Sequence, residues 1–312
     1  MTAVPEAPGA PLQFAATAGA LPESEVAGLA RRCRAADGGL PLVAEPWFVQ
    51  GRWGVPGVVS FSVRDGDGTL VGAAAVRPTA DGPVVTGLVD PACRGRDIGG
   101  HLLDAALAIA ETGGRGVTVE CEGLTAGAER LFEERGLRRF FAEDVMRTGL
   151  DPWEPAPVRL PDGVTLVEWA PETAERFHAV YAAAFRERPG FPDPPAAEWI
   201  TKNTEDADFR PGWSLLAVLP GIGDAGFVTA ADGWIVQVGV LPAARGAGLG
   251  GALVRESLRR MAATGAAEAW LCVDVDNPAG GLYRRLGFQE HGRRARYHLA
   301  PEPAGEDEAA AG

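Results

Sequence analysis

Residues 234–251 read WIVQVGVLPAARGAGLGG, and this stretch decides the fold of the second half of the chain. The segment Trp234–Val240 is rich in β-branched residues, which favours a strand, and Pro242 ends that strand. From Gly250 onward apolar residues recur at helical spacing until Gly265, which predicts a helix. A strand that passes through a glycine-rich turn into a helix is a local structure that holds anions.

The turn consists mostly of small residues, so its backbone N–H groups can approach an anion, and the helix N-terminus adds a partial positive charge. We therefore expect the turn to bind a phosphate-bearing ligand, through Arg245, Gly246, Ala247, Gly248, Leu249, Gly250 and Gly251. A Walker-type loop is excluded because no Gly-Lys-Ser/Thr follows.

The same glycines also fit the dinucleotide fingerprint G-x-G-x-x-G, with Asp274 at the place of a ribose-binding acid. A dinucleotide fold needs several more strand and helix repeats after this unit, and only about 60 residues remain. A nicotinamide enzyme therefore stays an alternative from another class.

The chain after the turn predicts a second strand and a short helix. The strand is Ala269–Val275, Asn277 and Pro278 start the helix, and Gly287 ends it. Two strands joined by a helix of this length should be parallel, with a right-handed connection.

A repeat is the most informative feature of the whole sequence. VDPACRGRDIGG at residues 89–100 matches VLPAARGAGLGG at residues 240–251, and LFEERGL at residues 131–137 matches LYRRLGF at residues 282–288. The offset is 151 residues in both pairs, so the chain contains two copies of one α/β fold.

Composition excludes several classes of protein. The chain has 312 residues and a net charge of −13, with Lys202 as its single lysine, which argues against a nucleic-acid partner. No stretch is long and apolar enough to span a membrane, and the N-terminus lacks the pattern of a secretion signal, so we expect a cytoplasmic protein. The four cysteines form no Cys-x-x-Cys pair, and no metal site is expected.

The pattern V-x-V-x-P-x-x-R-G-x-G-x-G-G, followed by Asn277 and LYRRLGF, resembles the GCN5-related N-acetyltransferase (GNAT) superfamily. The resemblance implies two tandem GNAT-like α/β domains, each a mixed, mostly antiparallel sheet with a central parallel pair flanked by helices. It also implies that acetyl-CoA is the cosubstrate, bound where the two parallel strands open.

By this resemblance, the backbone of Val238, Gly239 and Val240 pairs with the pantetheine arm, and Arg245 to Gly251 hold the diphosphate. Asn277 orients the cofactor near its thioester. Tyr283 falls on the family tyrosine that protonates the departing thiolate when an amine attacks directly.

The first copy departs from this pattern at each chemical position. Asp97 replaces Gly248, Ala126 replaces Asn277 and Phe132 replaces Tyr283. We predict that the first copy is catalytically silent and that the second is an N-acetyltransferase acting on a primary amine of a small molecule.

Three other functions stay open from the sequence. A tandem pair with one degenerate copy is similar to the mycothiol synthase family, but Trp234 occupies the place of the acid proposed as that family's base. A peptide N-terminal acetyltransferase and a non-catalytic CoA-binding module are the other two.

The expected domains are a degenerate copy at 13–150, a proline-rich linker at 151–161 and a catalytic copy at 162–300. Residues 1–12 and the acidic tail 301–312 are predicted to be disordered. We expect a monomer or a homodimer, with no nucleic-acid or membrane partner.

Overall fold

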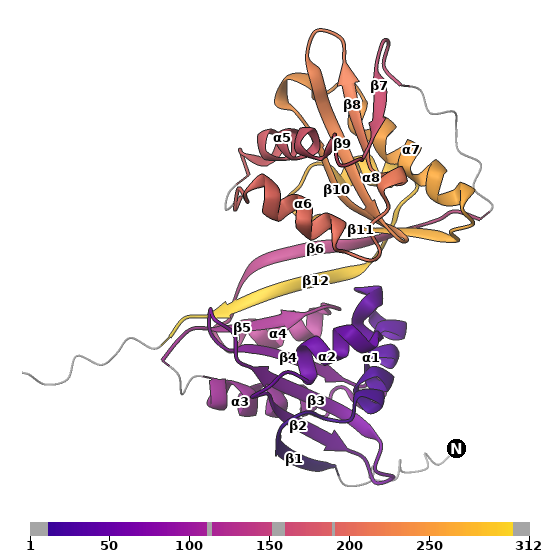
Figure 1. The fold of residues 1–312 in the computed structure, drawn as a ribbon. Helices are drawn as coiled ribbons and strands as arrows, with labels where there is room; N and C mark the ends of the chain where they lie inside the picture. The colour runs from indigo at the N-terminus through magenta and orange to yellow at the C-terminus, as the bar shows by residue number, and fades with distance from the viewer. Residues whose placement is uncertain (1–11, 111–113, 152–159, 189–190, 302–312) are drawn as a thin grey trace, which may run out of the picture. The chain divides into compact units, whose positions relative to one another are not determined.

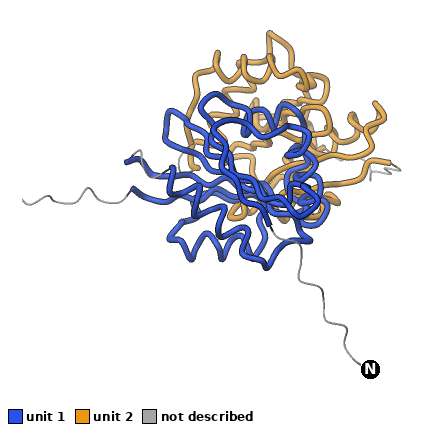
Figure 2. The backbone as a smooth tube through the Cα atoms, turned by 90° about the horizontal axis from the view of Figure 1, so that it is seen from below, with its two compact units in different colours: residues 1–144, 291–312 blue, residues 145–290 orange. Residues whose placement is uncertain are grey.

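The computed structural model describes residues 12–110, 114–151, 160–188 and 191–301. The chain divides into two compact units, which Figure 2 draws in blue and orange. Unit 1 contains residues 1–144 and 291–312, and unit 2 contains residues 145–290. The predictions for the two termini and for most of the linker fall on residues 1–11, 152–159 and 302–312, which lie outside the described residues.

The strands of unit 1 follow the order β1-β2-β3-β4-β5-β12 (Figure 1). All neighbouring pairs are antiparallel except β4 and β5, which are parallel. The elements are β1 (Gln13–Ala18), α1 (Glu23–Asp37), η1 (Pro41–Ala44), α2 (Pro46–Trp53), β2 (Val59–Arg64), β3 (Leu70–Arg77), β4 (Val84–Val89), η2 (Pro91–Cys93), α3 (Ile98–Ala110), β5 (Val117–Cys121), α4 (Ala126–Glu133) and β12 (Gln289–Leu299).

Strand β6 (Arg138–Gly149) begins in unit 1 and ends in unit 2, where the order is β6-β11-β10-β9-β8-β7. Here β10 and β11 are parallel, whereas β9 is antiparallel to both β10 and β8. The elements are β7 (Thr165–Glu168), α5 (Ala174–Phe185), α6 (Ala196–Thr204), η4 (Pro211–Trp213), β8 (Leu215–Leu219), β9 (Gly223–Ala231), β10 (Trp234–Val240), η5 (Pro242–Ala244), α7 (Leu249–Ala263), β11 (Glu268–Asp274) and α8 (Gly280–Arg285).

The predicted fold class is confirmed, since each unit has a mixed, mostly antiparallel sheet with one central parallel pair. Strand β10 has the predicted bounds, and β11 differs from its predicted range by one residue at each end. Helix α8 begins at Gly280 rather than directly after Pro278, because the residues between them form a turn.

The compact units and the two sequence copies differ at their last strands. Strand β12 ends the second copy, yet it pairs with β5 of unit 1, where Tyr297 lies opposite Val119. The end of β6 belongs to unit 2, where the Leu150 N–H donates to Ala267 O at 2.7 Å. The ranges 13–150 and 162–300 therefore remain a proposal about the sequence repeat.

The sheet of unit 2 is covered on both faces because alternate residues of β9 enter different cores. Val228 and Ala230 lie in the core with α7, and Phe227 lies in an aromatic core with α5 and α6. Figure 1 shows α5 and α6 on one side of the strands of unit 2 and α7 on the other. Among the described residues, no helix has the length and apolar character needed to cross a membrane.

Candidate functional site

The parallel strands of unit 2 open almost as soon as they meet. Among the described residues, Trp234 and Trp270 are the only pair between β10 and β11, and a bulge follows between Ile235 and Gln237 in the pairing with β9. The edge of β10 that faces β11 therefore has no strand partner in the described structure at Val238 to Val240, where an extended ligand can add hydrogen bonds as a further strand does.

The turn after β10 places a row of unpaired backbone donors at the start of α7. Gly246 and Gly248 have φ values of 83° and 79°, in the left-handed region that favours glycine. In the described part of the chain, the N–H groups of residues 246–251 form no backbone hydrogen bond. These donors and the helix dipole make a site for an anion such as a diphosphate.

Two glycines of the turn allow close packing of α8 against α7. A Cβ atom on Gly251 would lie 3.2 Å from Leu282 Cδ1, and one on Gly250 would lie 3.7 Å from Leu282 Cδ2. Because Tyr283 follows Leu282, this packing places the helix that carries Tyr283 beside the turn.

The Arg245 side chain turns back toward α5. Its guanidinium donates to Val240 O at 3.3 Å and to Ala184 O at 3.2 Å, and it pairs with Glu187 at 3.1 Å. Arg245 therefore links the turn to the end of β10 and the end of α5. The backbone N–H groups of the turn are the donors that remain available to bind a diphosphate.

Asn277 lies in the turn that links β11 to α8. Its side-chain oxygen accepts a hydrogen bond from the Ala279 N–H at 2.9 Å. The amide nitrogen of its side chain has no hydrogen-bond partner among the described residues, so it can donate to a ligand. The N-cap residue of α8 is Ala279, so the expected helix start at Asn277 is wrong, and the Asn277 side chain stabilises the turn before the helix.

Tyr283 is 8% exposed and packs on Phe288, with ring centroids 6.1 Å apart. Burial raises the pKa of the Tyr283 phenol to about 12. Its hydroxyl forms no hydrogen bond within the described chain, so the phenol is a neutral and uncommitted donor. Tyr283 shares one apolar core with Val238, Val240 and Leu249, which brings the predicted site residues into one region.

Four large aromatic side chains of unit 2 differ in burial. Trp199 and Trp213 are 3% and 9% exposed; Trp199 lies in the core with α5 and α6, and Trp213 lies in the core with α7. Trp234 is half-buried and lies beside Trp270, with centroids 6.3 Å apart. Phe191 is half-buried and stacks on Phe185, the last residue of α5.

Unit 1 keeps the turn and changes its charge. Asp97 adopts φ 58°, and its carboxylate lies against Gly100 in the first turn of α3. An aspartate is among the few residues that tolerate this conformation. The first copy thus carries a covalently attached anion at the place where the second copy offers free donors.

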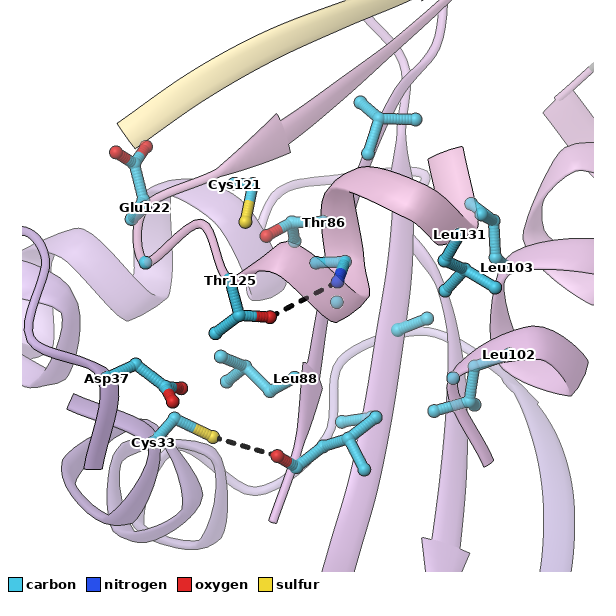
Figure 3. Close-up of a pocket in the computed structure, with 18 of the residues that line it drawn as sticks. Cys33, Asp37, Thr86, Leu88, Leu102, Leu103, Cys121, Glu122, Thr125 and Leu131 are labelled. Carbon is cyan, nitrogen blue, oxygen red and sulfur yellow. Dashed lines mark hydrogen bonds between the residues drawn. The ribbon is translucent and has the colours of Figure 1, made fainter. Parts of the chain in front are cut away.

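A cavity of about 530 Å³ lies in unit 1, along the opening between β4 and β5 (Figure 3). Thr86, Leu88, Cys121, Thr125 and Leu131 are among its lining residues. Sequence reasoning missed this cavity, although Arg94, Gly95 and Gly99 of the first copy retain the turn pattern.

The first copy stabilises the start of its α4 helix through a different residue. Thr125 is the N-cap of α4, and its Oγ1 accepts a hydrogen bond from the Ala128 N–H at 3.2 Å (Figure 3). Ala128 and Ala279, whose N–H groups donate to these side-chain oxygens, are 151 residues apart. Ala126 therefore removes a potential ligand donor from the first copy, while the start of α4 is still stabilised.

The cavity of unit 1 has room for a ligand, whereas the chemistry of the residues favours unit 2. In unit 1 the turn carries Asp97, and Phe132 has no hydroxyl to donate. Burial also raises the pKa of Cys33 to about 11 and that of Cys121 to about 12, so these cavity thiols stay protonated and unreactive. A cavity shows room for a ligand, but transfer of a group needs donors and a proton.

Comparison with known proteins gives a consistent result. The sequence model of the Acetyltransferase (GNAT) family matches residues 40–137 and 178–288. A mycothiol acetyltransferase of Thermobispora bispora is 35% identical over 284 residues, which cover 85% of this chain and 92% of the relative. A mycothiol acetyltransferase of Streptomyces avermitilis is 34% identical over 275 residues, which cover 81% and 84%.

Solved structures agree in fold. A GCN5-related N-acetyltransferase from Sphaerobacter thermophilus has a TM-score of 0.71 and 27% identity, and the match covers 93% of this chain and 96% of that one. A tandem GNAT protein from the clavulanic acid biosynthesis pathway has a TM-score of 0.60 and 20% identity, and the match covers 94% and 100%. The second likeness concerns the fold alone.

Proposed function

Because this chain belongs to the acetyltransferase (GNAT) family and is a tandem, acetyl-CoA-dependent N-acetyltransferase, we propose that unit 2 acetylates a primary amine of a small molecule. The observation that carries this assignment is the turn at residues 246–251, whose N–H groups are unpaired and whose counterpart in unit 1 holds Asp97. Only unit 2 combines free donors, Asn277 and Tyr283.

The cosubstrate fits the residues of unit 2 in three places. The open edge of β10 at Val238, Gly239 and Val240 suits the amides of a pantetheine arm, and the turn suits a diphosphate. The side-chain amide of Asn277 suits a carbonyl oxygen near the thioester. Acetyl-CoA supplies the activated acetyl group, and the protein supplies position and hydrogen bonds.

In this proposal the amine nitrogen attacks the thioester carbonyl carbon, the C–N bond forms and the C–S bond breaks. Tyr283 donates its phenolic proton toward the departing sulfur and later recovers a proton from water. A phenol with a pKa near 12 stays protonated and neutral at every physiological pH, so Tyr283 always has a proton to donate.

With its high pKa, Tyr283 protonates the departing thiolate efficiently only if the thiolate is also shielded from water, because the pKa values of the two groups are then similar. A free thiol has a pKa near 8.5, well below that of this phenol. Burial raises the thiol pKa to about 11 at Cys33 and about 12 at Cys121 in this same protein. A sulfur buried beside Tyr283 would rise in the same way, which brings the two groups close in proton affinity.

No carboxylate stands at the start of β10, where Trp234 packs on Trp270. Asp274 pairs with Arg188 at 3.5 Å, and the exposed Asp232 pairs with Arg210 at 3.0 Å. We propose that the amine loses its proton to water, which lowers the demand for a dedicated base.

The test is release of free thiol from acetyl-CoA with a panel of primary amines, among them glucosamine, 2-phenylethylamine and putrescine. The proposal expects amine-dependent release, with the acetylated amine confirmed by mass. A protein that binds acetyl-CoA but releases no thiol with any amine would instead be a CoA-binding module. Preference for peptides over small amines would support a peptide N-terminal acetyltransferase.

A second candidate is the activity named for the relatives, mycothiol acetyltransferase, since identity of 34–35% extends over more than four fifths of the chain. The replacement of the acid of that family by Trp234 is the residue-level difference to be explained. The resemblance implies an acceptor with a cysteinyl amine, which carries its own thiol. Its acetylation should therefore be measured by the mass of the product.

A further inference from the structure

Gln237 lies where β10 has already left β11. The last paired residue toward β11 is Trp234, and the bulge between Ile235 and Gln237 resets the register with β9. The side chain of Gln237 is half-buried, and its Oε1 atom is buried.

The register fixes the face on which this side chain lies. Gln237 is opposite Thr229 on β9, and directly opposite residues of an antiparallel pair share a face. Thr229 lies two residues after Phe227, which belongs to the aromatic core of α5 and α6. Gln237 therefore faces α5 and α6, opposite the face where α7 packs.

Polar atoms on this face lack partners. Gln237 Oε1 and Thr229 Oγ1 are buried and have no hydrogen bond in the described structure, and the same holds for Trp199 Nε1. A buried polar atom without a partner destabilises a fold, so each such group calls for a ligand or another explanation. These three are the described side-chain atoms of unit 2 in this condition, and all lie on the α5 and α6 side.

Aromatic rings lead from this face to the surface. Phe227 is opposite Gly239, and a Cβ on Gly239 would lie 2.5 Å from its ring. Phe185 packs on Phe227 with centroids 6.4 Å apart, and the half-buried Phe191 stacks on Phe185. A ring carried by a substrate can lie against such side chains.

Two ion pairs lie near this side of the sheet. Arg188, three residues after the end of α5, pairs with Asp274 at the end of β11, and Glu187 pairs with Arg245. The Gln237 carboxamide is thus a neutral polar group beside the opening between β10 and β11, and its buried Oε1 atom has no hydrogen-bond partner among the described residues.

We propose that Gln237 accepts an N–H hydrogen bond from the acceptor amine and so orients it, and that the acceptor is a primary amine whose molecule carries a ring. This inference rests on the proposed function. The carboxamide neither gains nor loses a proton. One N–H of the amine is held by Gln237, the nitrogen lone pair points at the thioester carbon, and the second amine proton leaves to water as the C–N bond forms.

The test compares Gln237→Leu, which removes the acceptor oxygen, with Gln237→Glu, which keeps an oxygen in the same place. Steady-state acetyl transfer is measured with glucosamine and 2-phenylethylamine as the ring-bearing probes. The leucine variant should lose about tenfold in kcat/KM for the amine, as expected for one hydrogen bond. Its Kd for acetyl-CoA, measured by calorimetry, should stay unchanged, and Gln237→Glu should recover most of the loss.

The matched control is Ser60→Ala, which removes a buried oxygen without a partner in unit 1 and should leave the kinetics unchanged. If Gln237→Leu does not fold, Gln237→Met replaces it. Unchanged kcat/KM in the folded variant overturns the proposal. Equal losses in acetyl-CoA affinity, without recovery by glutamate, also overturn it by showing a structural role.

The outcomes separate this inference from the proposed function. If the parent protein acetylates no amine at all, the proposed function fails and the inference fails with it. If it acetylates putrescine but neither ring-bearing probe, the ring-bearing class is wrong, and the role of Gln237 is then decided by kcat/KM for putrescine. If it acetylates a ring-bearing amine and the variants behave as expected, both stand.

Discussion

Asp97 and Gly248 adopt the same left-handed backbone conformation at equivalent places in the two units, with φ values of 58° and 79°. Each is 151 residues from the other, and each precedes the helix that follows the glycine-rich turn. The turn therefore has the same backbone conformation in both copies. In unit 2 it presents backbone N–H donors to a ligand, whereas in unit 1 it also presents the negative carboxylate of Asp97.

Exchange of Gly248 for Asp should abolish or strongly weaken acetyl-CoA binding while leaving the fold intact. The aspartate already tolerates this conformation in unit 1, and the strain should cost only about 1–2 kcal/mol. Two negative charges 4 Å apart repel by about 4 kcal/mol in a partly screened site, so affinity should fall at least roughly tenfold even in this exposed turn. Calorimetric titration with acetyl-CoA measures the loss.

The reverse exchange, Asp97→Gly, is the matched control for that experiment. It should leave the turnover of unit 2 at the parental value, since unit 1 has Phe132 in place of Tyr283. Affinity that survives in Gly248→Asp would contradict the account of the silent copy.

Exchange of Tyr283 for Phe should reduce kcat by about 10²–10⁴, the range expected when a positioned proton donor is lost. Phe132 shows that the first copy packs a phenylalanine at the equivalent position, at 8% exposure, so the variant should fold. The Kd for acetyl-CoA should change little. A large loss of thiol release with unchanged acetyl-CoA binding supports Tyr283 as the proton donor, whereas unchanged turnover contradicts that role.

Strong alkali should destabilise the protein through its buried phenols. The pKa of Tyr283 is raised to about 12 by burial, against about 10 in an unfolded chain. Below pH 10 the phenol is protonated in both states, so it adds no pH dependence there. Between pH 10 and 12 the unfolded state loses the proton first, and up to about 3 kcal/mol of stability is lost at this residue.

Thermal unfolding measured across this alkaline range checks the expectation. Burial also raises the pKa of Tyr181 and, to about 12, that of Tyr297, so the parent should show a steep fall in Tm. Tyr283→Phe should show a shallower fall, because one of the three phenols is gone. Equal slopes in the two proteins would speak against a buried Tyr283.

Asn277 is expected to act through both ends of its side-chain amide, and two variants separate them. Asn277→Asp keeps the oxygen that accepts from the Ala279 N–H in the turn before α8 and loses the amide donor, so stability should hold while acetyl-CoA affinity falls. Asn277→Ala loses both groups, and about 1 kcal/mol of stability should go with the turn hydrogen bond. Chemical denaturation and calorimetry measure the two effects.

Thr125→Ala in unit 1 is the control for these variants. It removes the hydrogen bond from the Ala128 N–H at the N-cap of α4 and should cost about 1 kcal/mol of stability without any change in acetyl-CoA affinity. Equal affinities of Asn277→Asp and the parent would show that Asn277 only stabilises the turn.

The sequence by itself determined the repeat, the strand Trp234–Val240, the turn and the family resemblance. These features are local: β-branched residues fix a strand, left-handed positions fix glycines, and helical spacing fixes the buried face of α7. The three replacements in the first copy could also be read directly, because the offset of 151 residues aligns each of them with its counterpart.

Only the tertiary structure decided which polar side chains have partners within the protein and which can bind a ligand. The sequence places Arg245 in the turn, but its engagement with Ala184 and Glu187 depends on where α5 ends. The pairing of β12 with β5 joins residues far apart in the chain, and the face of Gln237 depends on a bulge that shifts the register by one residue. Spacing along a chain predicts which element a residue belongs to, whereas the partners of a side chain are set by elements that meet only after folding.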